Sequence, residues 1–90
     1  MKTLEKRRSG NVMPNEFRRG VQSRLGKNIK RLMKRDGLSM YEIEARTGIG
    51  HTAIWRYVNG YTLPTVDKLL WLAQVQGWNL SELLGKVDVS

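Results

Sequence analysis

Residues 38–60 read LSMYEIEARTGIGHTAIWRYVNG and contain the pattern that decides the fold. Ser39 and Glu42 stand three residues apart, which is the spacing of a capping box at the start of a helix. The Gly-Ile-Gly sequence at 48–50 then interrupts the helical pattern, because glycine favours helix ends and turns. The stretch therefore predicts two short helices joined by a tight turn, over residues 40–47 and 51–58.

The second of these helices has two chemically different faces when its residues are placed about 100° apart. The apolar face consists of Ala53, Ile54, Tyr57 and Val58. The opposite face consists of His51, Thr52, Trp55, Arg56 and Asn59. One face can pack against a core, while the other offers hydrogen-bond donors suited to base edges in a DNA groove. This pattern is typical of a helix-turn-helix motif with its recognition helix at 51–58.

Size and composition exclude several classes of protein. Ninety residues make one small domain, with a core just large enough to fold unaided. The chain has no cysteine and a single histidine, so we expect no disulfide, no metal site and no cofactor. Apolar runs such as LLWLA at 69–73 are far shorter than the roughly 20 residues of a membrane span. No apolar stretch follows the basic N-terminus, so we expect a cytoplasmic protein without a secretory signal.

The formal net charge of +8 is concentrated in the first part of the chain. Residues 1–35 hold twelve Lys and Arg against two acids (+10), and residues 36–90 hold four against six (−2). A polyanion, most simply DNA, is the partner expected at that end. The alternative is a solvated basic helix face with a solubilising tail.

The chain divides into a flexible basic arm at 1–14, a helical domain at 15–86 and a short tail at 87–90. In the domain, an apolar stripe with helical spacing consists of Phe17, Val21, Leu25, Ile29, Leu32 and Met33. Gly20 weakens the first turn of this helix, so its secure part is expected at 21–35. Gly37 is placed to end it in a left-handed cap.

Two further helices are expected after the loop at 59–64. Thr65 caps the first, which runs to Gln76 with a buried stripe of Val66, Leu69, Leu70 and Ala73. Asn79 and Glu82 have capping-box spacing and start a short last helix that carries Leu83 and Leu84. No strand pattern is present, so the expected fold is all-α, a compact domain of five helices in which Tyr57 and Trp78 are buried.

The order and spacing of these segments resemble the Cro and phage-repressor type of helix-turn-helix protein over residues 24–85. The segments that carry the resemblance are LGKNIKRL, GLS, TGIG, NG followed by Pro64, LLWLA and WNLSELLG. The resemblance implies a sequence-specific regulator of transcription, a repressor that binds a palindromic operator in double-stranded DNA as a homodimer. No cofactor loop, activated nucleophile or carboxylate pair points to an enzyme.

The resemblance also implies which residues contact DNA. Base readout is expected from His51, Thr52 and Arg56, with His51 donating to a purine N7 and Arg56 pairing with guanine. The alternative for each is plain solvent exposure or, for Arg56, a phosphate contact. It further implies backbone contacts from Gly50, from Asn59 and, through main-chain N–H groups, from Met40. Independently of the resemblance, Trp55 lies on the open face of its helix and can pack on a sugar or a thymine methyl. The basic residues ahead of the secure helix can follow the DNA backbone or enter a minor groove; they are Lys2, Lys6, Arg7, Arg8, Arg18 and Arg19.

Three places depart from the family pattern. Glu44 stands where the family usually has Ala, so its carboxylate must turn outward or pair with Arg46 or Arg56. Met33 and Val58 occupy the places of a buried Arg–Glu pair, and apolar packing can replace such a pair. Trp71 stands where a charged residue is usual.

The candidate dimer or partner surface comprises Trp71, Val75, Leu80, Leu83 and Leu84. If that partner were a toxin, the chain would instead be an antitoxin-type interaction module with autoregulatory DNA binding.

Overall fold

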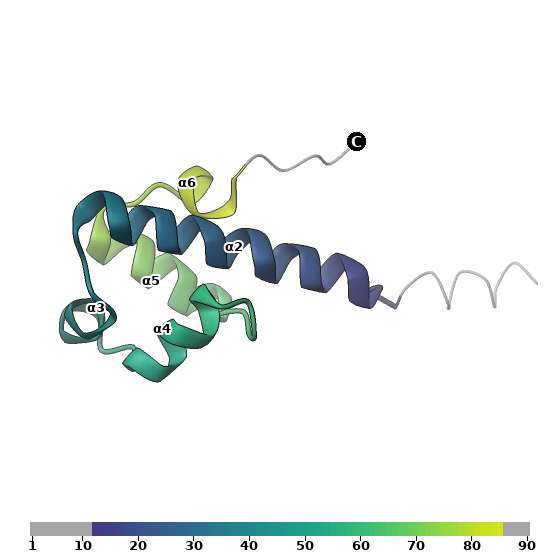
Figure 1. The fold of residues 1–90 in the computed structure, drawn as a ribbon, viewed down its shortest axis with the longest axis horizontal. Helices are drawn as coiled ribbons and strands as arrows, with labels where there is room; N and C mark the ends of the chain where they lie inside the picture. The colour runs from purple at the N-terminus through teal and green to yellow at the C-terminus, as the bar shows by residue number, and fades with distance from the viewer. Residues whose placement is uncertain (1–11, 86–90) are drawn as a thin grey trace, which may run out of the picture.

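The computed structural model describes residues 12–85, which form five α-helices and no strand (Figure 1). In chain order these are α2 (Asn15–Asp36), α3 (Met40–Thr47), α4 (His51–Val58), α5 (Val66–Gln76) and α6 (Leu80–Leu84). The predicted all-α fold is confirmed, and α3 and α4 have the predicted bounds. Within the described residues, no helix combines the length and the hydropathy needed to cross a bilayer.

One core joins all five helices. The long α2 packs against α4 and α6, and α5 packs against α3 and α6, so α2 lies between the recognition helix and the last helix (Figure 1). The fully buried side chains are Ile29, Leu32, Ile43, Ile54, Leu72 and Leu83. Tyr57 and Trp78 are buried as expected, and the indole N–H of Trp78 donates to Asp36 Oδ2 at 2.8 Å.

Helix α2 begins at Asn15, earlier than the expected start at residue 21. Gly20 does not interrupt it, because the helix is already held by its buried second half and extends through one exposed glycine at modest cost. Arg18 and Arg19, which were expected to precede the secure part of the helix, therefore lie within it. Phe17 is 62% exposed, so the apolar stripe is buried only from Leu25 onward. The expected arm residues Lys2, Lys6, Arg7 and Arg8 lie outside the described residues, as does the tail.

Gly26 allows α2 and the end of α4 to approach each other closely. A Cβ atom at this position would lie 2.6 Å from the carbonyl oxygens of both Tyr57 and Val58 at the end of α4. Backbone carbonyls cannot rotate away as side-chain ends can, so only glycine allows this approach. The contact fixes the end of α4 against the middle of α2.

The predicted buried face of α5 is wrong by a rotation of about 60° about the helix axis. Val66 and Leu70 are exposed, at 73% and 47%, whereas Leu72 is fully buried. Residues 69–73 are all apolar, so two neighbouring faces of the helix have nearly the same hydrophobicity. Packing against α3 and α6 selects the face that carries Leu72 and Ala73.

Polar contacts attach α6 to α2. Asn28 Nδ2 donates to the Leu83 carbonyl at 2.8 Å, and Arg35 pairs with Glu82 at 2.7 Å. The other Glu82 oxygen accepts from the Asn79 backbone N–H at 2.9 Å, as the capping-box spacing predicts. The carboxylate thus both caps α6 and joins it to the long helix.

Candidate nucleic-acid interface

The turn between α3 and α4 is held by local hydrogen bonds. Ser39 and Glu42 form the predicted capping box, which fixes the start of α3. Gly48 adopts φ +80°, a left-handed conformation that ends α3 and favours glycine. Thr47 Oγ1 donates to the Ile43 carbonyl and accepts from the Ile49 N–H, at 2.7 and 3.0 Å. With Ile49 buried as a plug, these contacts orient the first turn of α4.

The two faces of α4 are divided as predicted. Ile54 and Tyr57 are buried, and Ala53 and Val58 are half-buried against the core. The exposed residues on the outer side are Thr52, Trp55, Arg56 and Asn59, with His51 half-buried at the first position. Asn59 donates through Nδ2 to the Trp55 carbonyl at 2.9 Å, so its amide also closes the end of the helix. Arg56 forms no ion pair with any described residue.

Glu44 pairs with His51, not with the expected Arg46 or Arg56. Its Oε1 lies 2.7 Å from His51 Nδ1, and both side chains are partly exposed, at 41% and 45%. The hydrogen bond from the His51 ring holds the pKa of the Glu44 carboxyl below its ordinary value, and the His51 backbone N–H lowers it further. The Tyr41 ring also covers the imidazole, with ring centroids 4.6 Å apart. The helix-terminal position of His51 brings it closer to Glu44 than either arginine.

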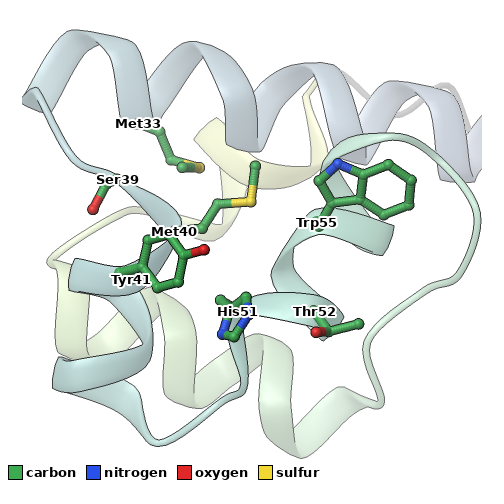
Figure 2. A pocket seen from close by; sticks show the side chains of 7 residues that line it. All are labelled: Met33, Ser39, Met40, Tyr41, His51, Thr52 and Trp55. Carbon is green, nitrogen blue, oxygen red and sulfur yellow. The ribbon is translucent and has the colours of Figure 1, made fainter.

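An apolar groove opens beside this pair. It has a volume of about 560 Å³ and is lined by Met33, Ser39, Met40, Tyr41, His51, Thr52 and Trp55. Figure 2 shows the side chains of Met33 and Met40 pointing into the same space from α2 and α3, with the Trp55 ring across from them. Met40 thus contributes an apolar side chain to the groove. Because this side chain has no hydrogen-bond donor, Met40 can donate to a phosphate only through its main-chain N–H at the start of α3.

Trp55 has an aromatic partner that helix periodicity does not reveal. Its ring stacks on Tyr61 with centroids 5.5 Å apart and an angle of 26° between the planes. Tyr61 belongs to the loop after α4. Gly60 has φ +75° at the start of this loop, and Gln22 Nε2 of α2 donates a hydrogen bond to the Tyr61 carbonyl. In the sequence, this partner of Trp55 is indicated only by an aromatic residue that directly follows the Asn59–Gly60 turn. The stack places a broad aromatic surface beside the exposed side of α4.

The cations of α2 lie on two different flanks of the helix. Arg31 and Arg35 turn toward α6, where Arg31 donates to the Glu82 carbonyl at 3.4 Å and Arg35 pairs with the Glu82 carboxylate. The other flank spans the arc of about 100° that runs from Gly26, which contacts α4, toward the side that faces α6. Its exposed cations, the basic stripe, are Arg19, Lys27, Lys30 and Lys34. Among the described residues, none of these four forms an ion pair.

The candidate partner surface is only partly exposed. Trp71 is 47% exposed, and its indole N–H donates to the Thr47 carbonyl at 2.8 Å, which ties it to the end of α3. Leu80 is 40% exposed, and Val75 and Leu84 are half-buried. Leu83 is fully buried in the core of this chain, so it cannot contribute to a surface.

The fold and this site define a helix-turn-helix DNA-binding domain. A family model described as helix-turn-helix matches residues 29–83, more than half of the chain. The chain belongs to the Cro and phage-repressor type of helix-turn-helix family, whose members are DNA-binding regulators of transcription. Comparison with curated proteins and with solved structures finds no match.

Proposed function

We propose that this protein is a transcriptional repressor that binds a palindromic operator as a homodimer. The observation that carries the proposal is the exposed polar side of α4, on a helix that packs against α2, which carries the exposed cations of the basic stripe. In helix-turn-helix proteins the second helix of the motif enters the major groove, and neighbouring segments grip the phosphates. Reading by α4 and phosphate contact by α2 would use both features at once.

Base readout is assigned to His51, Thr52 and Arg56. Arg56 is exposed and unpaired among the described residues, which suits bidentate hydrogen bonding to guanine O6 and N7. Thr52 is exposed in the first turn of α4, where its methyl group can contact a thymine methyl. His51 lies at the first position of the helix and contributes through its ring.

Backbone contacts are assigned to the ends of α3 and α4 and to their surroundings. Gly50 is exposed and has open space around it, so no side chain separates the start of α4 from a phosphate. Asn59 and Trp55 border the same surface, and Met40 contributes through the main chain. Arg18 and Arg19 extend the basic surface along the first turns of α2.

The N-terminal arm is a further proposed contact. Lys2, Lys6, Arg7 and Arg8 can follow the phosphate backbone or enter a minor groove. Deleting residues 2–14 should make the log–log salt dependence of operator binding shallower by roughly two to four units, because each neutralised phosphate contributes about 0.9. Binding measured over a range of salt concentrations tests this. An unchanged slope and affinity would show that the arm is only a solubilising tail.

A dimer is proposed because one short helix reads only a few base pairs, too few for selectivity in a genome. The apolar side chains available for it are Trp71, Val75, Leu80 and Leu84, together with the exposed Val66 and Leu70. In the complex, the two copies of α4 would lie about 34 Å apart, one turn of B-DNA.

Selection of bound DNA from a random pool tests the function, and sedimentation of the complex with one selected duplex tests its stoichiometry. We expect a palindromic motif and two chains per duplex. Failure to enrich any sequence would overturn the assignment of sequence-specific binding. A 1:1 complex at saturation would overturn the dimer alone.

An antitoxin-type interaction module is the second candidate function. The observation that favours it is the apolar surface of α5, where Val66, Leu70 and Trp71 are 73%, 47% and 47% exposed. A stable complex of the purified chain with a small toxin encoded by an adjacent gene would support this candidate. Mutation of these three residues would then abolish the protein complex while leaving the DNA-reading side of α4 intact.

A further inference from the structure

We propose that Glu44 is a positioning residue that fixes the tautomer of His51 and thereby decides which base His51 can read. The inference rests on the proposed function, in which α4 enters the major groove. It concerns a carboxylate that the sequence suggested would turn outward or pair with Arg46 or Arg56 and that the structure places against His51. The contact that carries it is the 2.7 Å hydrogen bond between Glu44 Oε1 and His51 Nδ1.

The direction of this hydrogen bond follows from the charge of Glu44. The pKa of the Glu44 carboxyl is lowered by its hydrogen bond with His51, so near neutral pH the group is a carboxylate. A carboxylate has no proton and can only accept, so His51 Nδ1 must carry the hydrogen. A neutral imidazole has a single N–H, and therefore Nε2 of His51 is left as an acceptor.

An acceptor at Nε2 reads different bases from a donor. In the major groove the hydrogen-bond donors are the N4 amino group of cytosine and the N6 amino group of adenine. Guanine offers only acceptors there, N7 and O6. Neutral His51 is therefore expected to favour cytosine or adenine over guanine, which replaces the expectation that it donates to a purine N7. Once the ring takes a second proton, Nε2 becomes a donor and guanine is favoured over cytosine.

The groups around His51 indicate that Glu44 determines the tautomer of the ring. The titratable groups placed against the ring are Glu44 and Tyr41, both on α3. Its groove neighbours from α2 and α4, Met33, Thr52 and Trp55, carry no charge. The Tyr41 ring restrains the imidazole from one side, and the His51 side chain remains 45% exposed, so its second nitrogen can be reached by a partner.

The tautomer can be measured without DNA. His51 is the chain's single histidine, so its ring nitrogens give unambiguous ¹⁵N signals in nuclear magnetic resonance spectra. We expect the Nδ1–H form in the unmodified protein at pH 8, the pH of the binding measurement below. In Glu44→Ala, no carboxylate holds the proton on Nδ1, and the signals should move toward the Nε2–H form. Observation of the Nε2–H form in the unmodified protein would overturn the inference.

The base preference is then measured on single-base variants of the selected operator. At pH 8 we expect one position per half-site to favour cytosine over guanine by about tenfold, the size of one hydrogen bond. In Glu44→Gln the preference should fall to about twofold or less, because an amide can accept from or donate to Nδ1.

A matched control separates this effect from the loss of a negative charge. Glu82→Gln removes the same charge on α6, where the carboxylate contacts Arg35 and not His51. It should leave the cytosine–guanine ratio unchanged. An Nδ1–H tautomer with no such discrimination at any position, or equal effects of the two variants on the ratio, would overturn the inference. Absence of any sequence preference would instead overturn the proposed function, while the tautomer measurement still decides the role of Glu44.

Discussion

The two ends of α4 are held in different ways. The end near Val58 rests against Gly26 of α2, where a Cβ atom would come within 2.6 Å of two carbonyl oxygens. The beginning at His51 has no side-chain cap from Gly50 and is held by Glu44 and Tyr41, in partly exposed contacts beside an open groove. The Val58 end is held by backbone atoms packed against a glycine, while the His51 end is held by contacts with ionisable side chains. Stability is therefore expected to depend most on the Gly26 end of α4, and the orientation of the His51 side chain on the other end.

The largest expected effect is at the Gly26 end. Gly26→Ala should lower the free energy of unfolding by about 3 kcal/mol, because the added methyl group would force α2 and α4 apart. Urea unfolding followed by circular dichroism measures this. Gly20→Ala is the matched control, since it lies in the same helix with nothing within 4 Å of the new atom. The control should be neutral or stabilising by up to about 1 kcal/mol. Equal losses in both variants would contradict the close contact.

The next effect concerns the exposed side between the two ends. Arg56→Ala should weaken specific binding by roughly 1–3 kcal/mol and relax the preference at one base position per half-site. The free energy of unfolding should change by less than about 0.5 kcal/mol, because Arg56 is exposed and opposite Ile54. Titration against single-base operator variants measures the binding. Uniform weakening across all variants would reduce Arg56 to a phosphate contact.

A smaller effect is expected where α3 supports the first turn of α4. Ser39→Ala removes the side chain that accepts from the Glu42 N–H at 3.1 Å, and such caps contribute about 1 kcal/mol. Hydrogen exchange should accelerate in α3 and at the beginning of α4 more than at the Gly26 contact. Uniform acceleration over all helices would show that the two ends of α4 open together.

The smallest expected effect is the contribution of Glu44, at the His51 end of α4, to the pH dependence of folding stability. Within residues 12–85, five carboxyls have pKa values below their ordinary values of 3.8 and 4.5: Asp36, Glu42, Glu44, Asp67 and Glu82. The unfolded chain therefore binds more protons on acidification, so stability present above pH 4.5 is lost as the pH falls through these lowered values. Thermal unfolding from pH 6 to pH 3 should show a falling Tm. In Glu44→Gln the fall should be shallower, and an identical slope would mean that the Glu44 contact does not contribute.

Much of this arrangement could be predicted because it depends on local rules. Capping boxes at Ser39 and Asn79, the glycine turn at Gly48 and the two faces of α4 each involve residues a few positions apart. The same rules failed where a contact joins distant segments. Gly26 and Val58 are not neighbours in the chain, and nothing local indicates that a mid-helix glycine faces a carbonyl.

The remaining differences have the same origin. The apolar residues of α5 occupy too much of its circumference for periodicity to select a face, so its rotation depends on its neighbours. The sequence offered Arg46 and Arg56 as partners for Glu44, and only the placement of α3 against α4 shows that His51 takes that place. Tyr61 joins the site through the path of a loop, which no periodic pattern describes. Candidate residues on α4 itself could be named from the sequence, but not the partners that orient them.

The contact at Gly26 also bears on how such a protein can diverge. Because the end of α4 is held through backbone atoms, its exposed side chains can change without repacking the core. If α4 reads bases as proposed, substitutions at positions 51, 52 and 56 can redirect the protein to new operators, whereas a side chain at position 26 lowers the stability of the fold. Among proteins descended from this chain, we therefore expect the exposed positions of α4 to vary most and position 26 to remain glycine. The fold would then be kept while the operator sequence changes.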